Sequence, residues 1–167
     1  MKNYVKEGQK LPMFGIGPYL IAGIFAVTAI GVLLFSYLLK AGILEGIWVW
    51  IFRIVGSLLM ICGIAVWYIG SLRSDMDESI IENKLQTGGI YSWVRNPMYS
   101  GWWILITGIS LMWHNWLLLL IVPINWAIMT VVLKNTEEKW LLDLYGPEYA
   151  EYQKCVNRCI PWIPRKK

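Results

Sequence analysis

The 167-residue chain is 57% hydrophobic and 16% charged, with a net charge of +4 and a mean hydropathy of +0.50. Because its apolar residues come in long blocks, this composition excludes a soluble globular domain of the same length. The length suits one domain. We therefore expect a single all-α, polytopic integral membrane domain over residues 1–167.

Four apolar blocks predict about four transmembrane helices, over about residues 16–39, 47–70, 98–113 and 116–133. Around 20 apolar residues cross a hydrocarbon core of ~30 Å, so the third block is short for a span. Only His114-Asn115 separates the last two blocks. These two blocks are therefore predicted to form a tight hairpin.

The second block contains one charge, Arg53, about two turns from its start. An arginine inside a membrane marks a functional site by default, but this one is close enough to the end to extend to the interface. Three glycines recur every seven residues in the same block, namely Gly56, Gly63 and Gly70. Small residues at this spacing predict close approach of a neighbouring helix.

The polar parts of the chain are the connection 71–86 and everything after Leu133. We expect one or two interfacial helical turns in the connection, a helix ending at Gly146-Pro147, and a second short helix from Glu148 to about Val156. The pair Cys155 and Cys159 lacks the further ligands of a four-coordinate zinc site, so we expect no metal.

Positive charge predicts the orientation. All but two of the 15 Lys and Arg residues, the exceptions being Lys40 and Arg53, fall on one side of a four-span arrangement. The positive-inside rule then makes both termini cytoplasmic. We expect an integral protein of a bacterial or archaeal type of plasma membrane.

Two polar islands lie on this side, Thr87–Gly101 and Asn135–Glu138. Pro97 predicts a helix start whose free N–H groups face the interface, while Glu137 returns negative charge to the same depth. Such a site suits a ligand that is part nucleoside and part cation. The alternative is an interface anchor in which Arg95 pins the helix end and the glutamates pair with nearby lysines.

The islands carry two patterns, G-x-Y-x-x-x-R-N-P-x-Y-x-G over residues 89–101 and E-E-x-x-L-x-x-x-Y-G-x-E-Y-x-x-Y over residues 137–152. Together they resemble the membrane methyltransferase superfamily of isoprenylcysteine carboxyl methyltransferases and phospholipid methyltransferases. The likeness covers about half of the chain. It implies S-adenosylmethionine as the cofactor, held by elements within 83–101 and 134–164.

Carried over by position, the resemblance implies these cofactor contacts: Asn83, Lys84, Leu85, Gln86, Tyr91, Asn96, Pro97, Met98, Tyr99 and Glu137. The implied catalytic residues are Arg95, Asn96 and Glu137. Glu137 would accept from the methionine ammonium, and Arg95 would anchor the loop or meet an anionic substrate group.

Two positions depart from the family pattern. Many members have histidine where this chain has Asn96, and asparagine does not titrate near neutral pH. Prenylcysteine enzymes have an arginine proposed to contact the substrate carboxylate where this chain has Leu133. Three methyl acceptors therefore remain as alternatives: a phospholipid amine, a prenylcysteine-like carboxylate and a thiol.

The predicted function is S-adenosylmethionine-dependent methylation of a lipophilic or membrane-associated small molecule. Its expected partners are that acceptor and membrane lipid, with no nucleic acid. One alternative is a small four-helix transporter, which Arg53 would support. Another is a protein like the membrane sterol reductases, whose C-terminal part has a similar Arg-x-Pro-x-Tyr segment.

Overall fold

The computed structural model describes residues 4–6, 9–11, 15–73 and 84–162. Within these ranges the fold is all-α apart from one short antiparallel hairpin, as the composition predicts. The hairpin consists of β1 (Tyr4–Lys6) and β2 (Gln9–Leu11), with Val5 opposite Lys10. These two strands were not predicted from the sequence.

The helices follow the predicted blocks closely. In chain order they are α1 (Gly17–Val32) with its π-helical extension η1 (Leu33–Leu38), α2 (Ile47–Ser71), the 3₁₀ turn η2 (Gly89–Ser92), α4 (Pro97–Leu111), the 3₁₀ turn η3 (Trp116–Leu120), α5 (Ile121–Asn135), α6 (Glu137–Tyr145) and α7 (Pro147–Cys155). Three of them begin with proline in the first turn, where its missing N–H has no intrahelical partner to lose.

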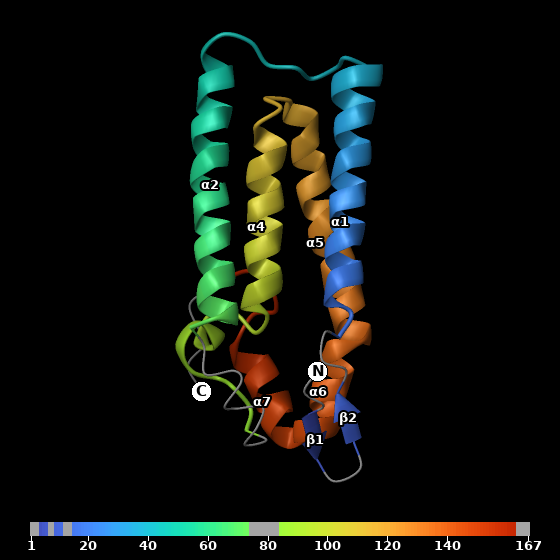
Figure 1. Ribbon diagram of the computed structural model, residues 1–167, viewed down its shortest axis with the longest axis vertical. Helices are drawn as coiled ribbons and strands as arrows, with labels where there is room; N and C mark the ends of the chain where they lie inside the picture. The colour runs from blue at the N-terminus through green and yellow to red at the C-terminus, as the bar shows by residue number, and fades with distance from the viewer. Residues whose placement is uncertain (1–3, 7–8, 12–14, 74–83, 163–167) are drawn as a thin grey trace.

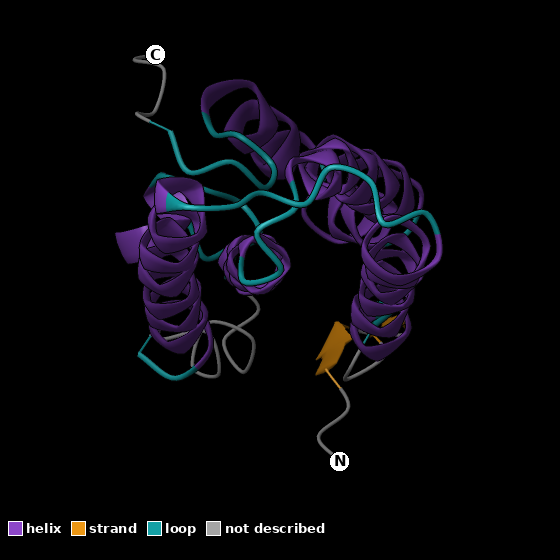
Figure 2. Ribbon diagram, turned by 90° about the horizontal axis from the view of Figure 1, so that it is seen from above, coloured by secondary structure: helices purple, strands orange, loops and turns teal. Residues whose placement is uncertain are grey.

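Four long helices lie side by side, with α4 between α2 and the α1–α5 pair (Figures 1 and 2). The hairpin β1–β2, the start of α1, and helices α6 and α7 lie at one end of this bundle (Figure 1). The α1–α2 loop and the α4–α5 turn lie at the other end. Both polar islands are therefore at the same end, as charge counting predicts.

Glycines set the distance between α2 and α4. Gly56, Gly63 and Gly70 are the buried residues of α2, and a Cβ on Gly63 would lie 2.6 Å from the backbone nitrogen of Leu105. On α4, a Cβ on Gly108 would lie 2.6 Å from the carbonyl oxygen of Gly56. The predicted close approach is confirmed, and it places the start of α4 against the end of α2.

Three stretches among the described residues are long and apolar enough to cross a membrane: Gly17–Leu38, Ile47–Ser71 and Trp116–Tyr145. They suit an integral membrane protein. Helix α4 has 15 residues, about 22 Å at 1.5 Å per residue, which is shorter than a ~30 Å core. A fourth span over 98–113 stays a prediction. The predicted interfacial turns in 71–86 fall largely on residues 74–83, outside the described residues.

The end of the bundle away from the islands is held by Asn115, which has no exposed surface. Its Nδ2 donates to the Ser36 hydroxyl at 3.1 Å and to the Ala41 carbonyl at 2.9 Å, while its Oδ1 accepts from the Leu117 N–H at 3.0 Å. Arg53, near this end, lies 6.0 Å from the ring centroid of Trp50. That contact fits the interfacial alternative for Arg53 better than a coupling site.

Candidate functional site

The second polar island begins with a bend and supplies the negative charge of the site. Helix α5 ends at Asn135, Thr136 has φ −123° and ψ −91°, and α6 starts directly with Glu137 and Glu138. Because consecutive residues on a helix point about 100° apart, the two carboxylates face different neighbours. They have different surroundings as a result.

Glu138 is a buried anion shared by two arginines. Its Oε1 lies 2.9 Å from Nη2 of Arg95 and 2.7 Å from Nε of Arg158, while its Oε2 accepts from Nη2 of Arg158 at 2.8 Å. The side chains of Arg95 and Glu138 are 7% and 4% exposed. A carboxylate this deep requires such pairing, because desolvation penalises an unpaired charge by several kcal/mol. The cluster ties the first island to α6 and to the chain after α7.

Glu137 faces the start of α1 instead. Its Oε1 accepts from the Tyr99 hydroxyl at 2.5 Å, and its carboxylate also accepts from the Ile16 backbone N–H. Gly15, at φ +51°, passes so close that a Cβ there would lie 2.5 Å from that oxygen. Within residues 15–73 and 84–162 no basic side chain pairs with Glu137. Among these residues it is a half-buried carboxylate without a cationic partner.

The C-terminal segment 156–162 lies along the first island as a parallel strand-like contact. Val94 pairs with Asn157, the Arg95 N–H donates to the Asn157 carbonyl at 2.8 Å, and the Asn96 N–H donates to the Arg158 carbonyl at 3.0 Å. The Asn96 side chain adds a 3.3 Å bond from Nδ2 to the same carbonyl. Asn96 therefore positions the segment, a role that asparagine's amide donor suits.

The remaining predicted contacts support the loop before α4. Tyr91 is buried and its hydroxyl donates to the Gly70 carbonyl at 3.2 Å, while its own carbonyl accepts from the Tyr152 hydroxyl at 2.5 Å. Leu85 packs against the cluster of Tyr149, Tyr152 and Val156. These contacts explain the tyrosines of the second sequence pattern as packing residues.

Four further predicted residues have simpler surroundings. The Lys84 carbonyl accepts from the Tyr145 hydroxyl at 3.4 Å, Gln86 and Met98 are half-buried, and Pro97 is fully buried against Gly70. Asn83 lies outside the described residues. The structure thus gathers the predicted residues at one junction, but in two groups, one around Glu137 and one around Arg95.

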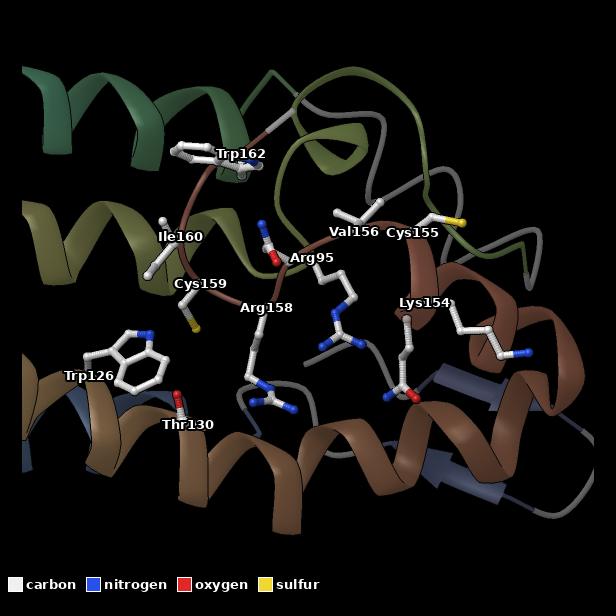
Figure 3. Close-up of a pocket in the computed structure, with 12 residues that line it drawn as sticks. Arg95, Trp126, Thr130, Lys154, Cys155, Val156, Arg158, Cys159, Ile160 and Trp162 are labelled. Atoms are coloured by element: carbon white, nitrogen blue, oxygen red, sulfur yellow. The ribbon is translucent and has the colours of Figure 1, made fainter. Parts of the chain in front are cut away.

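A cavity of about 770 Å³ opens beside Arg95, between α5, the end of α7 and the C-terminal segment (Figure 3). That volume lies in the range of small-molecule sites. Among the predicted site residues Arg95 lines it. Residues that were not predicted for the site make up the rest of its wall, including Trp126, Thr130, Arg158, Cys159 and Trp162. Because α5 and the C-terminal segment are far apart in the sequence, no local sequence pattern indicates this cavity.

Cys159 is 1% exposed in this wall, and burial raises the pKa of its thiol to about 12. The thiol therefore stays protonated at neutral pH and is a poor nucleophile. The three cysteines are free, and the described residues contain no group of His, Cys, Asp and Glu arranged to hold a metal ion.

The sequence pattern of the phospholipid methyltransferase family matches residues 50–148, which include all of the first motif and most of the second. The chain belongs to this family. Its segment from α2 to the start of α7 thus carries the family pattern, and the C-terminal segment that completes the cavity lies beyond it.

Curated relatives agree at the level of the superfamily. The chain is 34% identical over 84 residues to the protein-S-isoprenylcysteine O-methyltransferase of Schizosaccharomyces pombe, covering 50% of this chain and 35% of that one. It is 29% identical over 124 residues to the enzyme of that name from Dictyostelium discoideum, covering 65% and 49%. Methanethiol S-methyltransferase 1 of Bradyrhizobium diazoefficiens is 32% identical over 79 residues, covering 47% and 27%.

The chain spans no more than about half the length of these relatives. No solved structure matches it. Leu133, at the position where prenylcysteine enzymes are expected to have arginine, is fully buried in the hydrophobic core with Tyr99 and Cys159. A cation for an anionic substrate group would therefore have to come from elsewhere in this chain.

Proposed function

We propose that this protein is an S-adenosylmethionine-dependent methyltransferase acting on a lipophilic or membrane-associated acceptor. The observation that carries the proposal is the family match over residues 50–148, whose two motifs meet at one end of the bundle. The membrane-length apolar helices support a lipophilic acceptor. Both termini and the junction would be cytoplasmic.

The residues at the junction fit the charges of the cofactor. Glu137 is a half-buried carboxylate without a basic partner in the described ranges, and a carboxylate accepts about four hydrogen bonds. After Tyr99 and the Ile16 N–H it retains capacity for an ammonium group. We assign it that role, as the resemblance implies, with the predicted contacts of the Tyr91 to Tyr99 loop beside it.

When bound, S-adenosylmethionine would supply a methyl group attached to a positively charged sulfur. As the methyl group is transferred, the sulfur keeps the electron pair of the broken C–S bond and leaves as a neutral thioether. The leaving group is thus already activated, and the protein's contribution is to orient the two reactants and exclude water. Orientation alone contributes up to ~7–11 kcal/mol in favourable cases. Tyr99 fixes the Glu137 carboxylate, and the Glu138 cluster fixes Arg95 and the chain beside it.

The acceptor is not common to the relatives, whose names include both isoprenylcysteine and methanethiol. The direct test is transfer of labelled methyl groups from S-adenosylmethionine into host lipid extract and, separately, into small thiols, using the purified full chain. We expect incorporation above a Glu137→Ala control. If the protein binds the cofactor but transfers no label to the lipid extract and none to the small thiols, the proposed activity is contradicted.

A further inference from the structure

The chain enters α1 directly beside Glu137, at the end of the bundle that holds α6 (Figure 1). We call residues 15–17 the entry segment. Its Ile16 N–H donates to the Glu137 carboxylate. A Cβ on Gly15 would lie 2.5 Å from Oε1 of Glu137, so the Gly15 backbone itself lies against that oxygen. The entry segment thus covers one side of the carboxylate with backbone atoms.

This close approach requires both glycines of the entry segment. Gly15 has φ +51°, in the left-handed region that favours glycine, and a side chain there would meet Glu137. Gly17 is buried, and a Cβ there would lie 3.0 Å from the hydroxyl oxygen of Tyr99, which donates to the same carboxylate. A larger residue at either position would push the segment away from the glutamate or from the tyrosine.

Electrostatics favours the same contact. The N-cap residue of α1, Ile16, makes no side-chain capping bond, and the first turn of α1 contains no acidic residue. Glu137, on α6, instead supplies the negative charge that the N-terminus of a helix favours. Its carboxylate is therefore fixed from three directions: by its own helix, by the Tyr99 hydroxyl and by the start of α1.

We propose that the entry segment completes the site for the ammonium group of the cofactor, with Gly15 and Gly17 as positioning residues. The Tyr99 hydroxyl and the Gly15 backbone lie at Oε1 of Glu137, so the ammonium group would bind at Oε2. This inference rests on the proposed function, in which Glu137 accepts from that ammonium group. It extends the site to the start of α1, outside the matched residues 50–148.

Two glycine variants separate this role from backbone strain. Gly46 also has a positive φ, +60°, but a Cβ there would meet nothing within 4 Å. Gly15→Ala and Gly46→Ala therefore both place alanine in the left-handed region, and only the first displaces Glu137. Calorimetry on the full chain in phosphatidylcholine nanodiscs should show S-adenosylmethionine binding about tenfold more weakly to Gly15→Ala, because a hydrogen bond to a charged group is worth roughly that factor. Gly46→Ala should change the affinity less than twofold.

A ligand without the ammonium group distinguishes positioning from a general loss of structure. Methylthioadenosine has the adenosine and the sulfur of the cofactor but lacks its amino-acid part. Its affinity should change less than twofold in Gly15→Ala, because the substitution acts through Glu137. Equal weakening of the two ligands would mean that the whole junction is distorted, and the proposal would be wrong.

Gly17→Ala is a second, milder test that does not place alanine at a positive φ. It should displace the Tyr99 hydroxyl and weaken binding of S-adenosylmethionine about threefold to fivefold, the worth of one ordinary hydrogen bond. The matched control is Gly23→Ala, on the same helix, where a Cβ would meet nothing within 4 Å. This pair of variants decides the matter if Gly15→Ala does not fold.

The outcomes keep this inference apart from the proposed activity. If Gly15→Ala and Gly17→Ala bind S-adenosylmethionine as tightly as their controls, the entry segment has no part in the site, and the proposed activity stands. If both variants behave as expected but the unsubstituted chain transfers no labelled methyl group, the proposed activity alone is contradicted. An unsubstituted chain that binds no S-adenosylmethionine would contradict both.

Discussion

The two ends of the bundle each contain a buried polar side chain at a junction of loops, and they differ in how its bonds are used. At the α4–α5 turn, Asn115 donates twice and accepts once, all within the protein. At the other end, the Arg95 side chain is almost as deeply buried, but its Nε and Nη1 have no acceptor among the described residues. The first end pairs the amide of its buried asparagine within the protein, whereas the second leaves buried guanidinium nitrogens that no described residue pairs.

The end of the bundle at Asn115 therefore contributes mainly to stability, and the end at Arg95 contributes to function as well. A fully paired buried group stabilises the fold and has no free hydrogen-bonding capacity for a ligand. Unpaired buried donors lower the stability of the fold and are retained where ligand binding compensates for that loss. Substitutions at the two ends should therefore divide into those that change unfolding and those that change binding.

The largest effect is expected for Glu138→Ala. It leaves Arg95 and Arg158 without their shared carboxylate, and breaking a buried ion pair in this way costs about 3–5 kcal/mol. Thermal unfolding in detergent should show the loss. The control is Glu151→Ala, which removes the exposed pair with Lys154 and should have little effect. Similar stability of the two variants would contradict a buried charge cluster at this end.

Asn115→Ala tests the other end. Three hydrogen bonds are lost, and the Ala41 carbonyl, the Ser36 hydroxyl and the Leu117 N–H each lose this partner, so the free energy of unfolding should fall by about 2–3 kcal/mol. Asn135→Ala, which removes one exposed side-chain bond, is the control. Cofactor affinity below the unfolding temperature should match the unsubstituted protein. A change in that affinity would show that the two ends are coupled.

Glu137→Gln should affect binding rather than folding. The amide oxygen still accepts from Tyr99, but the negative charge is lost, so affinity for S-adenosylmethionine should fall about tenfold to a hundredfold. Calorimetry measures it, with Glu148→Gln, an exposed glutamate of the same motif, as the matched control. Unchanged affinity in Glu137→Gln would overturn the assignment of this carboxylate to the ammonium.

The smallest change is expected for Tyr99→Phe. The ring remains packed and only the hydroxyl that orients Glu137 is lost, which is worth about 1 kcal/mol, or roughly fivefold in cofactor affinity. Combining it with Glu137→Gln should give less than the product of the two effects, since the residues are in contact. Independent effects would mean that Tyr99 does not act through Glu137.

The sequence predicted those features that depend on local pattern. Hydrophobic blocks located the helices, the seven-residue glycine spacing located the α2–α4 contact, and Gly146-Pro147 located the break between α6 and α7. Charge asymmetry placed both islands at one end. The first three signals each lie within one segment of the sequence, and the last is a sum of charges over several segments.

The partners of the site residues could not be predicted from the sequence, because they lie on segments that are far apart in the chain. The glutamates were expected either to bind a ligand or to pair with nearby lysines, yet Glu138 pairs with Arg95 and Arg158, which lie on other segments. Nothing in the sequence near Arg158 indicates that it contacts residue 138. The E-E pair alone does not show which glutamate two arginines share and which has no basic partner among the described residues. The packing around the α5–α6 bend decides this.

The contact between the C-terminal segment and the first island has a consequence for the order of biosynthesis. Asn96 and its partner Arg158 are separated by 62 residues, so the island leaves the ribosome well before the segment that pairs with it. The helices α2 and α4 can associate through their glycines while the wall of the cavity is still untranslated. A chain terminated just after Cys155 would be expected to insert and pack these helices, yet lack the backbone partner of Asn96 and one arginine of the Glu138 cluster.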